Sequence, residues 1–227
     1  MKKIFKYQTW HLLLVIIFLG FAQLFVASTP ELMSKELWSI SSKSWFWIAV
    51  ATPIVHQIYV WLVWRLELYK NIFSSLYGLE KAFKAYKIGF SILFVSRLIF
   101  IIILSYSDMH SLEISSYVVY TIVAIITLPV IYLFYSVKKY FTIDRAFGID
   151  HFDKSYNVAF EKKGIFRFTN NGMYIYGLMI LYIPGLLLFS KAALVVALFN
   201  HIYIWVHYYT TELPDIKEIY GKTPIKK

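Results

Sequence analysis

The apolar residues of this chain gather in six long runs that are separated by polar segments. A helix needs roughly 20 mostly apolar residues to cross the hydrocarbon core of a membrane. Each run approaches that length, and none contains more than one charged residue. The runs are His11–Ser28, Trp45–Trp64, Ile88–Ser107, Ser115–Val137, Tyr174–Ser190 and Ala192–Thr211. The pattern predicts an all-α fold, a transmembrane helical bundle of about six spans, in a single integral-membrane domain over residues 1–227.

The last two runs are separated only by Lys191. In lipid, every backbone polar group must be satisfied within helices, so two apolar runs this close together predict a transmembrane helical hairpin. The sequence YIPGLLLFSKAAL before the turn predicts a kink at Pro184–Gly185, because proline removes a helical hydrogen bond.

Basic residues alternate between the polar segments that flank the six runs. From the N-terminus to the C-terminus, these segments carry 3, 2, 5, 0, 7, 1 and 4 lysines and arginines. Short loops rich in lysine and arginine favour the cytoplasmic side. The alternation therefore predicts that both termini and the two long loops are cytoplasmic.

Two segments allow more than one interpretation. The first run follows a Lys-rich start, as a signal peptide would, but it is longer than the core of roughly 7–15 residues that is usual in such peptides. The segment LELYKNIFSSLYGLEKAFKAYK, residues 66–87, has apolar residues at helical spacing with lysines between them. It is either an amphipathic helix on the cytoplasmic leaflet or an extension of the neighbouring spans.

Composition supports a membrane protein and excludes several kinds of site. Charged residues make up 16% of the chain, against roughly a quarter in soluble domains. The absence of cysteine excludes disulfides and thiolate metal sites, and the sequence has no G-x-G-x-x-G, P-loop, H-E-x-x-H or G-x-S-x-G motif. The basic residues behind the net charge of +10 lie between apolar runs, so we expect the membrane and its anionic lipids as partners rather than nucleic acid. No metal is expected.

Polar residues continue along the last run towards its predicted cytoplasmic end. With about 100° per residue on a helix, they fall on two adjacent stripes, one of Asn200, His207 and Thr211 and one of His201, Tyr208 and Glu212. Polar residues within a span either face the bundle interior or a wet cavity, or hold helices together by hydrogen bonds.

Three more polar residues lie inside predicted spans. On insertion scales, an arginine at the centre of a span costs roughly 2.5–3.5 kcal/mol of membrane-insertion free energy. Arg97 should therefore have a partner, either a tyrosine, a backbone carbonyl or an anionic group. His56 and Gln57 are expected to be packing contacts rather than ligands.

The stretch GIFRFTNNGMY, Gly164–Tyr174, resembles the signature of the integral-membrane methyltransferases, which include phosphatidylethanolamine N-methyltransferase and isoprenylcysteine carboxyl methyltransferase. In that superfamily a transmembrane hairpin follows the signature, and its second helix ends in an acidic pair, a Leu and an F/Y-G. Here TELPDIKEIYG supplies Glu212 at the second acidic position and Tyr220–Gly221 at the end. The resemblance covers residues 164–221, the methyltransferase-signature region.

Three positions depart from the superfamily pattern. Asn170 stands where an arginine is common, Gly172 replaces a proline, and Thr211 replaces the first acidic residue. Asn171 with Met173 and Tyr174 is closer to the phospholipid branch.

The resemblance implies that the methyl donor is S-adenosylmethionine, bound at the cytoplasmic end between the signature, the hairpin and the tail. It implies cofactor binding by Asn170, Asn171, Met173, Tyr174, His201, Tyr208 and Glu212, and catalysis by Glu212 and His207. These residue types suit the donor, because amides can bind a carboxylate and an amine and aromatic faces attract a sulfonium. An amine acceptor must lose a proton, for which Glu212 or His207 would be the base.

The function implied is a membrane-embedded methyltransferase that moves a methyl group from S-adenosylmethionine to a lipid acceptor, first of all a phospholipid amine such as phosphatidylethanolamine. Within the same class, the alternative is carboxyl methylation of a prenylated cysteine or another lipophilic acceptor. From a different class, the alternative is a non-catalytic transporter or membrane scaffold.

Overall fold

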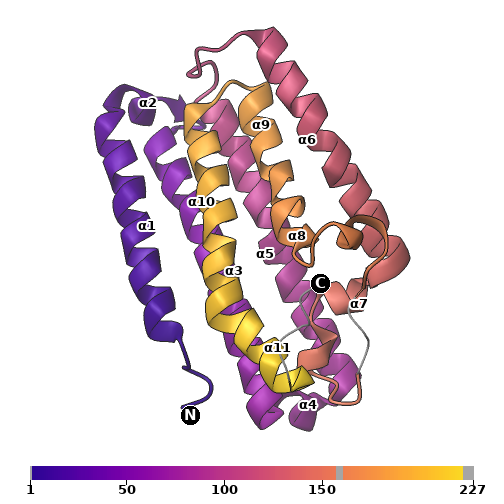
Figure 1. The fold of residues 1–227 in the computed structure, drawn as a ribbon. Helices are drawn as coiled ribbons and strands as arrows, with labels where there is room; N and C mark the ends of the chain where they lie inside the picture. The colour runs from indigo at the N-terminus through magenta and orange to yellow at the C-terminus, as the bar shows by residue number, and fades with distance from the viewer. Residues whose placement is uncertain (1, 157–160, 222–227) are drawn as a thin grey trace.

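The computed structural model describes residues 2–156 and 161–221, and its described part is an all-α bundle, as predicted (Figure 1). The long helices lie side by side. They are α1 (Gln8–Ser28), α3 (Ser42–Lys70), α5 (Leu79–Ser107), α6 (Ser116–Ser136) with its π-helical continuation η1 (Val137–Phe141), and α10 (Lys191–His207) with η5 (Tyr208–Glu212) and α11 (Leu213–Tyr220). Within the described residues, five helices are long and apolar enough to cross a membrane.

Short elements connect these helices. They are α2 (Pro30–Ser34), the antiparallel strands β1 (Glu36–Leu37) and β2 (Ile40–Ser41), α4 (Ile72–Tyr77), α7 (Ile143–Ala146), η2 (Ile149–His151) and η3 (Gly164–Arg167). The first arm of the hairpin is made of α8 (Gly172–Ile175), η4 (Gly177–Leu181) and α9 (Tyr182–Leu187).

The hairpin differs from the two full-length spans expected. Its first arm is a shorter apolar helix, Gly172–Leu187, and the arm breaks at η4, where the backbone tightens to a 3₁₀ helix. This break lies before Pro184–Gly185 rather than at it, and the N–H that Pro184 lacks would have bonded to the carbonyl of Ile180 within η4. In Figure 1, α8 begins well short of the end of the bundle where α11 lies. The sixth expected span is therefore a short, broken helix.

Segment 66–87 mainly extends the neighbouring spans. The α3 helix continues to Lys70, and α5 begins at Leu79, so that only α4 remains as a separate short helix between them. Glu67 organises this connection, since its Oε2 accepts hydrogen bonds from the backbone N–H groups of Phe73 (2.9 Å) and Ser74 (3.2 Å). Of the two interpretations, extension of the spans fits the structure better.

The α10 helix lies at the centre of the bundle. Small side chains at its start allow close packing, and Ala192, Ala193 and Val196 are fully buried. Gly185 of α9 packs against this surface so tightly that a Cβ there would lie 3.2 Å from the Cβ of Ala193. Asp108 accepts hydrogen bonds from the Ser190 hydroxyl (3.0 Å) and the Ala192 backbone N–H (2.9 Å). A carboxylate thus stabilises the N-terminus of the central helix.

Candidate active site

The last long helix changes its backbone geometry where the predicted site residues lie. Between α10 and α11 the chain forms one π-helical segment, η5, which contains Tyr208, Thr211 and Glu212. Pro214, the second residue of α11, has no N–H for the usual bond to the Thr210 carbonyl. That carbonyl accepts instead from Gln8 Nε2 (3.2 Å) and Arg65 Nη2 (2.9 Å). Short π-helical segments are rare and often mark functional sites.

On one side of η5, the signature residues meet the end of the last span. The Tyr208 ring lies edge-on to the Tyr174 ring, with 5.8 Å between centroids, and both contact Trp205. The half-buried Asn171 side chain faces the Tyr208 hydroxyl. Asn171 also begins α8, because its carbonyl accepts the backbone N–H groups of Tyr174 and Ile175 (both 3.0 Å).

On the other side of η5, buried polar atoms lack hydrogen-bond partners within the described residues. They are Glu212 Oε2 and His207 Nδ1, next to Trp64 and Tyr86, whose polar atoms face each other, and to His151, whose Nε2 faces Asp215. These groups lie close together, since the Trp64 ring stacks on His151 at 4.0 Å and lies 5.9 Å from His207. An unpaired buried polar group costs about 1–3 kcal/mol, so their collection beside Glu212 is a candidate ligand-binding site.

A buried ion pair fixes η5 and α11 to the rest of the bundle. Arg65 Nε donates to Asp215 Oδ1 at 3.0 Å, and both side chains are almost completely buried. Arg65 Nη1 also donates to the carbonyls of Ile4 (3.0 Å) and Lys6 (2.7 Å). The N-terminal segment and α11 therefore lie at the same end of the bundle (Figure 1).

His151 completes this charged cluster from the loop after α7. Its Nδ1 lies 3.0 Å from Asp150 Oδ1, and its Nε2 lies 3.8 Å from Asp215 Oδ2, which is too long for a hydrogen bond but within ion-pair range. Burial lowers the pKa of His151, but the hydrogen bond to Asp150 and the charges of both aspartates outweigh burial and raise it to about 9. The imidazole is therefore cationic at neutral pH.

Three of the predicted cofactor-binding residues lie apart from this arrangement. Asn170 is exposed. Met173 packs with Leu133 and the residues of η3, away from α10. His201 contacts Tyr182 and lines an apolar crevice between α6, α9 and α10. Asn171 and Tyr174 contact Tyr208 on one side of η5, Glu212 and His207 lie on the other side, and these three residues lie outside both groups.

The other polar residues of the spans are buried. Asn200, His207 and Thr211 are at most 2% exposed, in agreement with a stripe that faces the interior. Arg97 is buried as well, and its Nε and Nη2 atoms have no hydrogen-bond partner within the described residues. The edge of the His56 ring packs on Phe90, with 4.5 Å between centroids, as expected of a packing contact.

Sequence reasoning missed Arg65, Asp215, His151 and Trp64. The sequence gives only weak indications of the roles of Arg65 and Asp215. Arg65 comes directly after an uncharged run, and Asp215 comes directly after a proline at the start of a helix. Their pairing across 150 positions is visible only in the structure. Within the described residues, no group of three or more His, Asp or Glu side chains is arranged to hold a metal ion.

Comparison with known proteins gives one match. The model of the phospholipid methyltransferase family matches residues 114–223, which include α6, the signature, the hairpin and η5. No curated protein matches, and no solved structure matches. Helices α1, α3 and α5 lie outside the matched range. Residues 114–223 are thus similar to the phospholipid methyltransferase family, which is consistent with the integral-membrane methyltransferase superfamily that the signature resembles.

Proposed function

We propose that this protein transfers a methyl group from S-adenosylmethionine to the amine of a membrane phospholipid, at a site around η5. The observation that carries the proposal is that Asn171 and Tyr174 of the signature contact Tyr208 of η5, the segment that also contains Glu212, all within residues that the family match covers. When bound, S-adenosylmethionine supplies a methyl group on a positively charged sulfur, ready for displacement by a nucleophile.

The residues around η5 fit such a donor. Its sulfonium and adenine suit the rings of Tyr174 and Tyr208, because cations and flat rings are attracted to aromatic faces. Its amino-acid group is a zwitterion, and the Asn171 amide can donate to a carboxylate. The buried Glu212 Oε2, which lacks a partner within the described residues, suits an ammonium.

An amine acceptor needs a base. A protonated amine has no lone pair for attack on a methyl group, so a group of the protein must take its proton. The candidates on the same side of η5 are the Glu212 carboxylate and His207 Nδ1, both buried and without partners within the described residues. Much of the rate would come from holding the two reactants in line and away from water.

We place this site on the cytoplasmic side of the membrane. The proposal rests on the basic residues of the N-terminal segment, of the loop around α4 and of the loop after α6, which all flank the same end of the bundle. A cytoplasmic site would have direct access to a soluble donor.

The first experiment measures donor binding and transfer by the purified protein in detergent. Labelled S-adenosylmethionine is bound at equilibrium and then supplied with phosphatidylethanolamine vesicles. We expect Glu212→Gln and Tyr208→Ala each to weaken binding or slow transfer roughly tenfold or more. Matched controls are Glu218→Gln, an exposed carboxylate on α11, and Tyr209→Ala, the exposed neighbour of Tyr208, which should leave both quantities unchanged.

The same assay separates the acceptors. Transfer to a prenylated cysteine carboxylate but not to phosphatidylethanolamine would replace the amine acceptor by the alternative. Absence of donor binding by the folded wild-type protein would refute the proposed function, and full activity of both Glu212→Gln and Tyr208→Ala would refute the site.

A further inference from the structure

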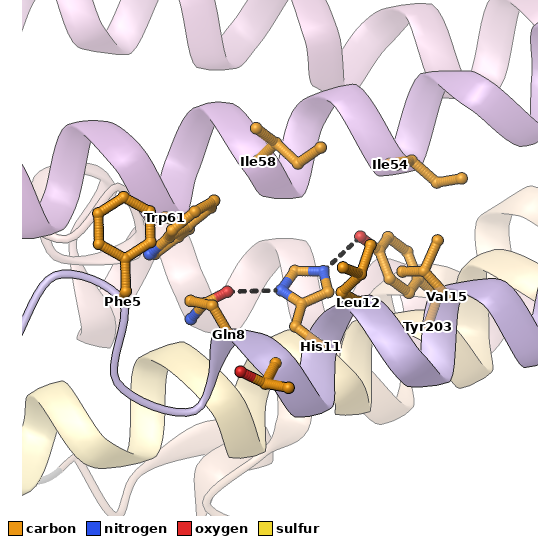
Figure 2. Close-up of a pocket in the computed structure, with 10 residues that line it drawn as sticks. Phe5, Gln8, His11, Leu12, Val15, Ile54, Ile58, Trp61 and Tyr203 are labelled. Carbon is orange, nitrogen blue, oxygen red and sulfur yellow. Dashed lines mark hydrogen bonds between the residues drawn. The ribbon is translucent and has the colours of Figure 1, made fainter.

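A second feature of the structure lies next to η5 but outside the family match. A crevice of about 420 Å³ opens between α1 and α3, within the range of roughly 300–1,000 Å³ typical of ligand pockets. Its walls include Leu12 and Val15 of α1, Ile54 and Ile58 of α3, and Tyr203 of α10 (Figure 2). Both α1 and α3 are candidate membrane spans, so the crevice opens sideways towards lipid.

Aromatic contacts limit the crevice along the bundle. At the end near the N-terminus, the Phe5 ring meets Trp61 edge-on at 5.7 Å, and Trp61 Nε1 donates to the Ile4 carbonyl at 2.9 Å. Further along the same two helices, Phe25 of α1 and Phe46 of α3 are in contact, with ring centroids 5.6 Å apart. Between these contacts α1 and α3 are separated by the crevice.

The polar side chains at the crevice are occupied by one another. Figure 2 shows His11 between Gln8 and Tyr203. Gln8 Nε2 donates to the Thr210 carbonyl, so Gln8 Oε1 must accept from His11 Nδ1 (2.9 Å). His11 Nε2 therefore accepts from the Tyr203 hydroxyl (2.6 Å). Because these polar atoms already bond to one another, they are not free to bind a polar head group. A suitable occupant of the crevice is therefore apolar.

The same polar row connects the crevice to the candidate active site. Gln8 Nε2 also lies 3.2 Å from Thr211 Oγ1, and Thr211 precedes Glu212 in η5. The N-terminal segment at this end carries Lys2 and Lys6, which suit the phosphate of a phospholipid, and Lys3, which pairs with Glu218 at 2.6 Å. A lipid chain in the crevice would therefore leave its head group near both the lysines and η5.

From these observations we propose that the crevice between α1 and α3 binds one hydrocarbon chain of the acceptor lipid and directs its head group towards η5. The inference rests on the proposed function for the identity of the lipid as the acceptor. It assigns acceptor binding to α1 and α3, whereas the residues proposed for the donor belong to α8 and η5.

The test uses phosphatidylethanolamine with a photoactivatable diazirine in one acyl chain, added to the full-length protein in phosphatidylcholine vesicles. After illumination, mass spectrometry locates the labelled residues. We expect labelling within residues 5–15 and 54–61. Leu12→Trp, which fills the crevice, should reduce this labelling at least fivefold and raise the KM for a long-chain acceptor but not for a short-chain one.

Leu13→Trp is the matched control, because Leu13 is also exposed on α1 but does not line the crevice. It should change neither labelling nor KM. Ile58→Trp fills the crevice from α3 and serves as a second variant if Leu12→Trp does not fold, as judged by thermal melting.

The outcomes separate the two proposals. Normal methyl transfer with labelling elsewhere, for example at the crevice beside His201, would overturn the chain-binding proposal and leave the proposed function standing. Unchanged labelling in both tryptophan variants would overturn it as well. Crevice labelling that Leu12→Trp removes, in a protein that methylates no lipid, would uphold chain binding and overturn the proposed function.

Discussion

Raising the pH from 7 to 9.5 should destabilise the folded protein through His151. The pKa of this group is raised from 6.5 to about 9 in the folded state, because the hydrogen bond to Asp150 and the charge of Asp215 outweigh burial. A group with a raised folded-state pKa stabilises the fold fully below its unfolded pKa, and this contribution disappears as the pH rises through the folded pKa. His151 lies outside the candidate spans, so the unfolded reference is an imidazole in water.

The shift sets the size of the effect. A shift of this size corresponds to about 3 kcal/mol at low pH, of which about 2 kcal/mol should be lost between pH 7 and pH 9.5. The free energy of unfolding is measured by SDS titration of the detergent-solubilised protein without donor, followed by tryptophan fluorescence. His151→Gln is the reference variant, since it removes the titrating ring while keeping a hydrogen-bond donor.

The decisive quantity is the difference between the two proteins in how steeply the free energy of unfolding falls with pH. The wild-type free energy of unfolding should fall more steeply than that of His151→Gln between these pH values, because other titrating groups are common to both proteins. Parallel curves for the two proteins would show that His151 is not held as a cation by Asp150 and Asp215.

Three substitutions test other parts of the fold by the same unfolding measurement. Arg65→Met should lower the free energy of unfolding by about 3–5 kcal/mol, because it leaves Asp215 buried without its donor. The double variant with Asp215→Leu should lose less stability than the two single variants together, and additive losses would contradict a coupled pair. Asp108→Ala should cost about 3 kcal/mol, since it removes the charge and acceptor at the start of α10, whereas a loss below 1 kcal/mol would mean that water replaces it. Gly148→Ala should cost about 2 kcal/mol, because φ is +76° there and a Cβ would lie 2.6 Å from the Trp64 ring; wild-type stability would show that the loop shifts freely.

Hydropathy predicts the long helices well because burial in lipid depends on the length and composition of a run. The run Ser115–Val137 corresponds closely to α6, and His11–Ser28 corresponds to α1. Local breaks are less predictable, since they depend on packing. Pro184 suggested a kink, but the interruption lies at η4, where Gly177 packs closely against Leu133 of α6.

Only some of the predicted site residues lie beside η5, and the positions of the others have geometric reasons. Met173 and Tyr174 are neighbours in α8 and point about 100° apart, so only one of them can face α10. His201 and Tyr208 fall on the same stripe, but seven residues separate them by about 10 Å along the helix. The pattern along one helix predicts which way a side chain points, but not which segment it meets at that level of the bundle. The ion pair of Arg65 with Asp215 joins residues far apart in the sequence, so no local pattern predicts it.

The polar atoms on the two sides of the last span differ in whether they have hydrogen-bond partners. Gln8, His11 and Tyr203 pair with one another, whereas Glu212 Oε2 and His207 Nδ1 are buried without partners within the described residues. Unpaired buried groups destabilise the free protein by about 1–3 kcal/mol each, so a ligand that supplies partners should stabilise it.

At 100 times its Kd, S-adenosylmethionine should raise the free energy of unfolding by about 2.7 kcal/mol, which thermal melting detects as a higher Tm. The same donor concentration should stabilise Glu218→Gln equally and Glu212→Gln much less. Equal stabilisation of the wild type and Glu212→Gln would mean that the unpaired carboxylate beside η5 does not contact the donor. The polar atoms around Glu212 would then be satisfied by something other than the methyl donor, and the site would have to be sought on the other side of η5, among Asn171, Tyr174 and Tyr208.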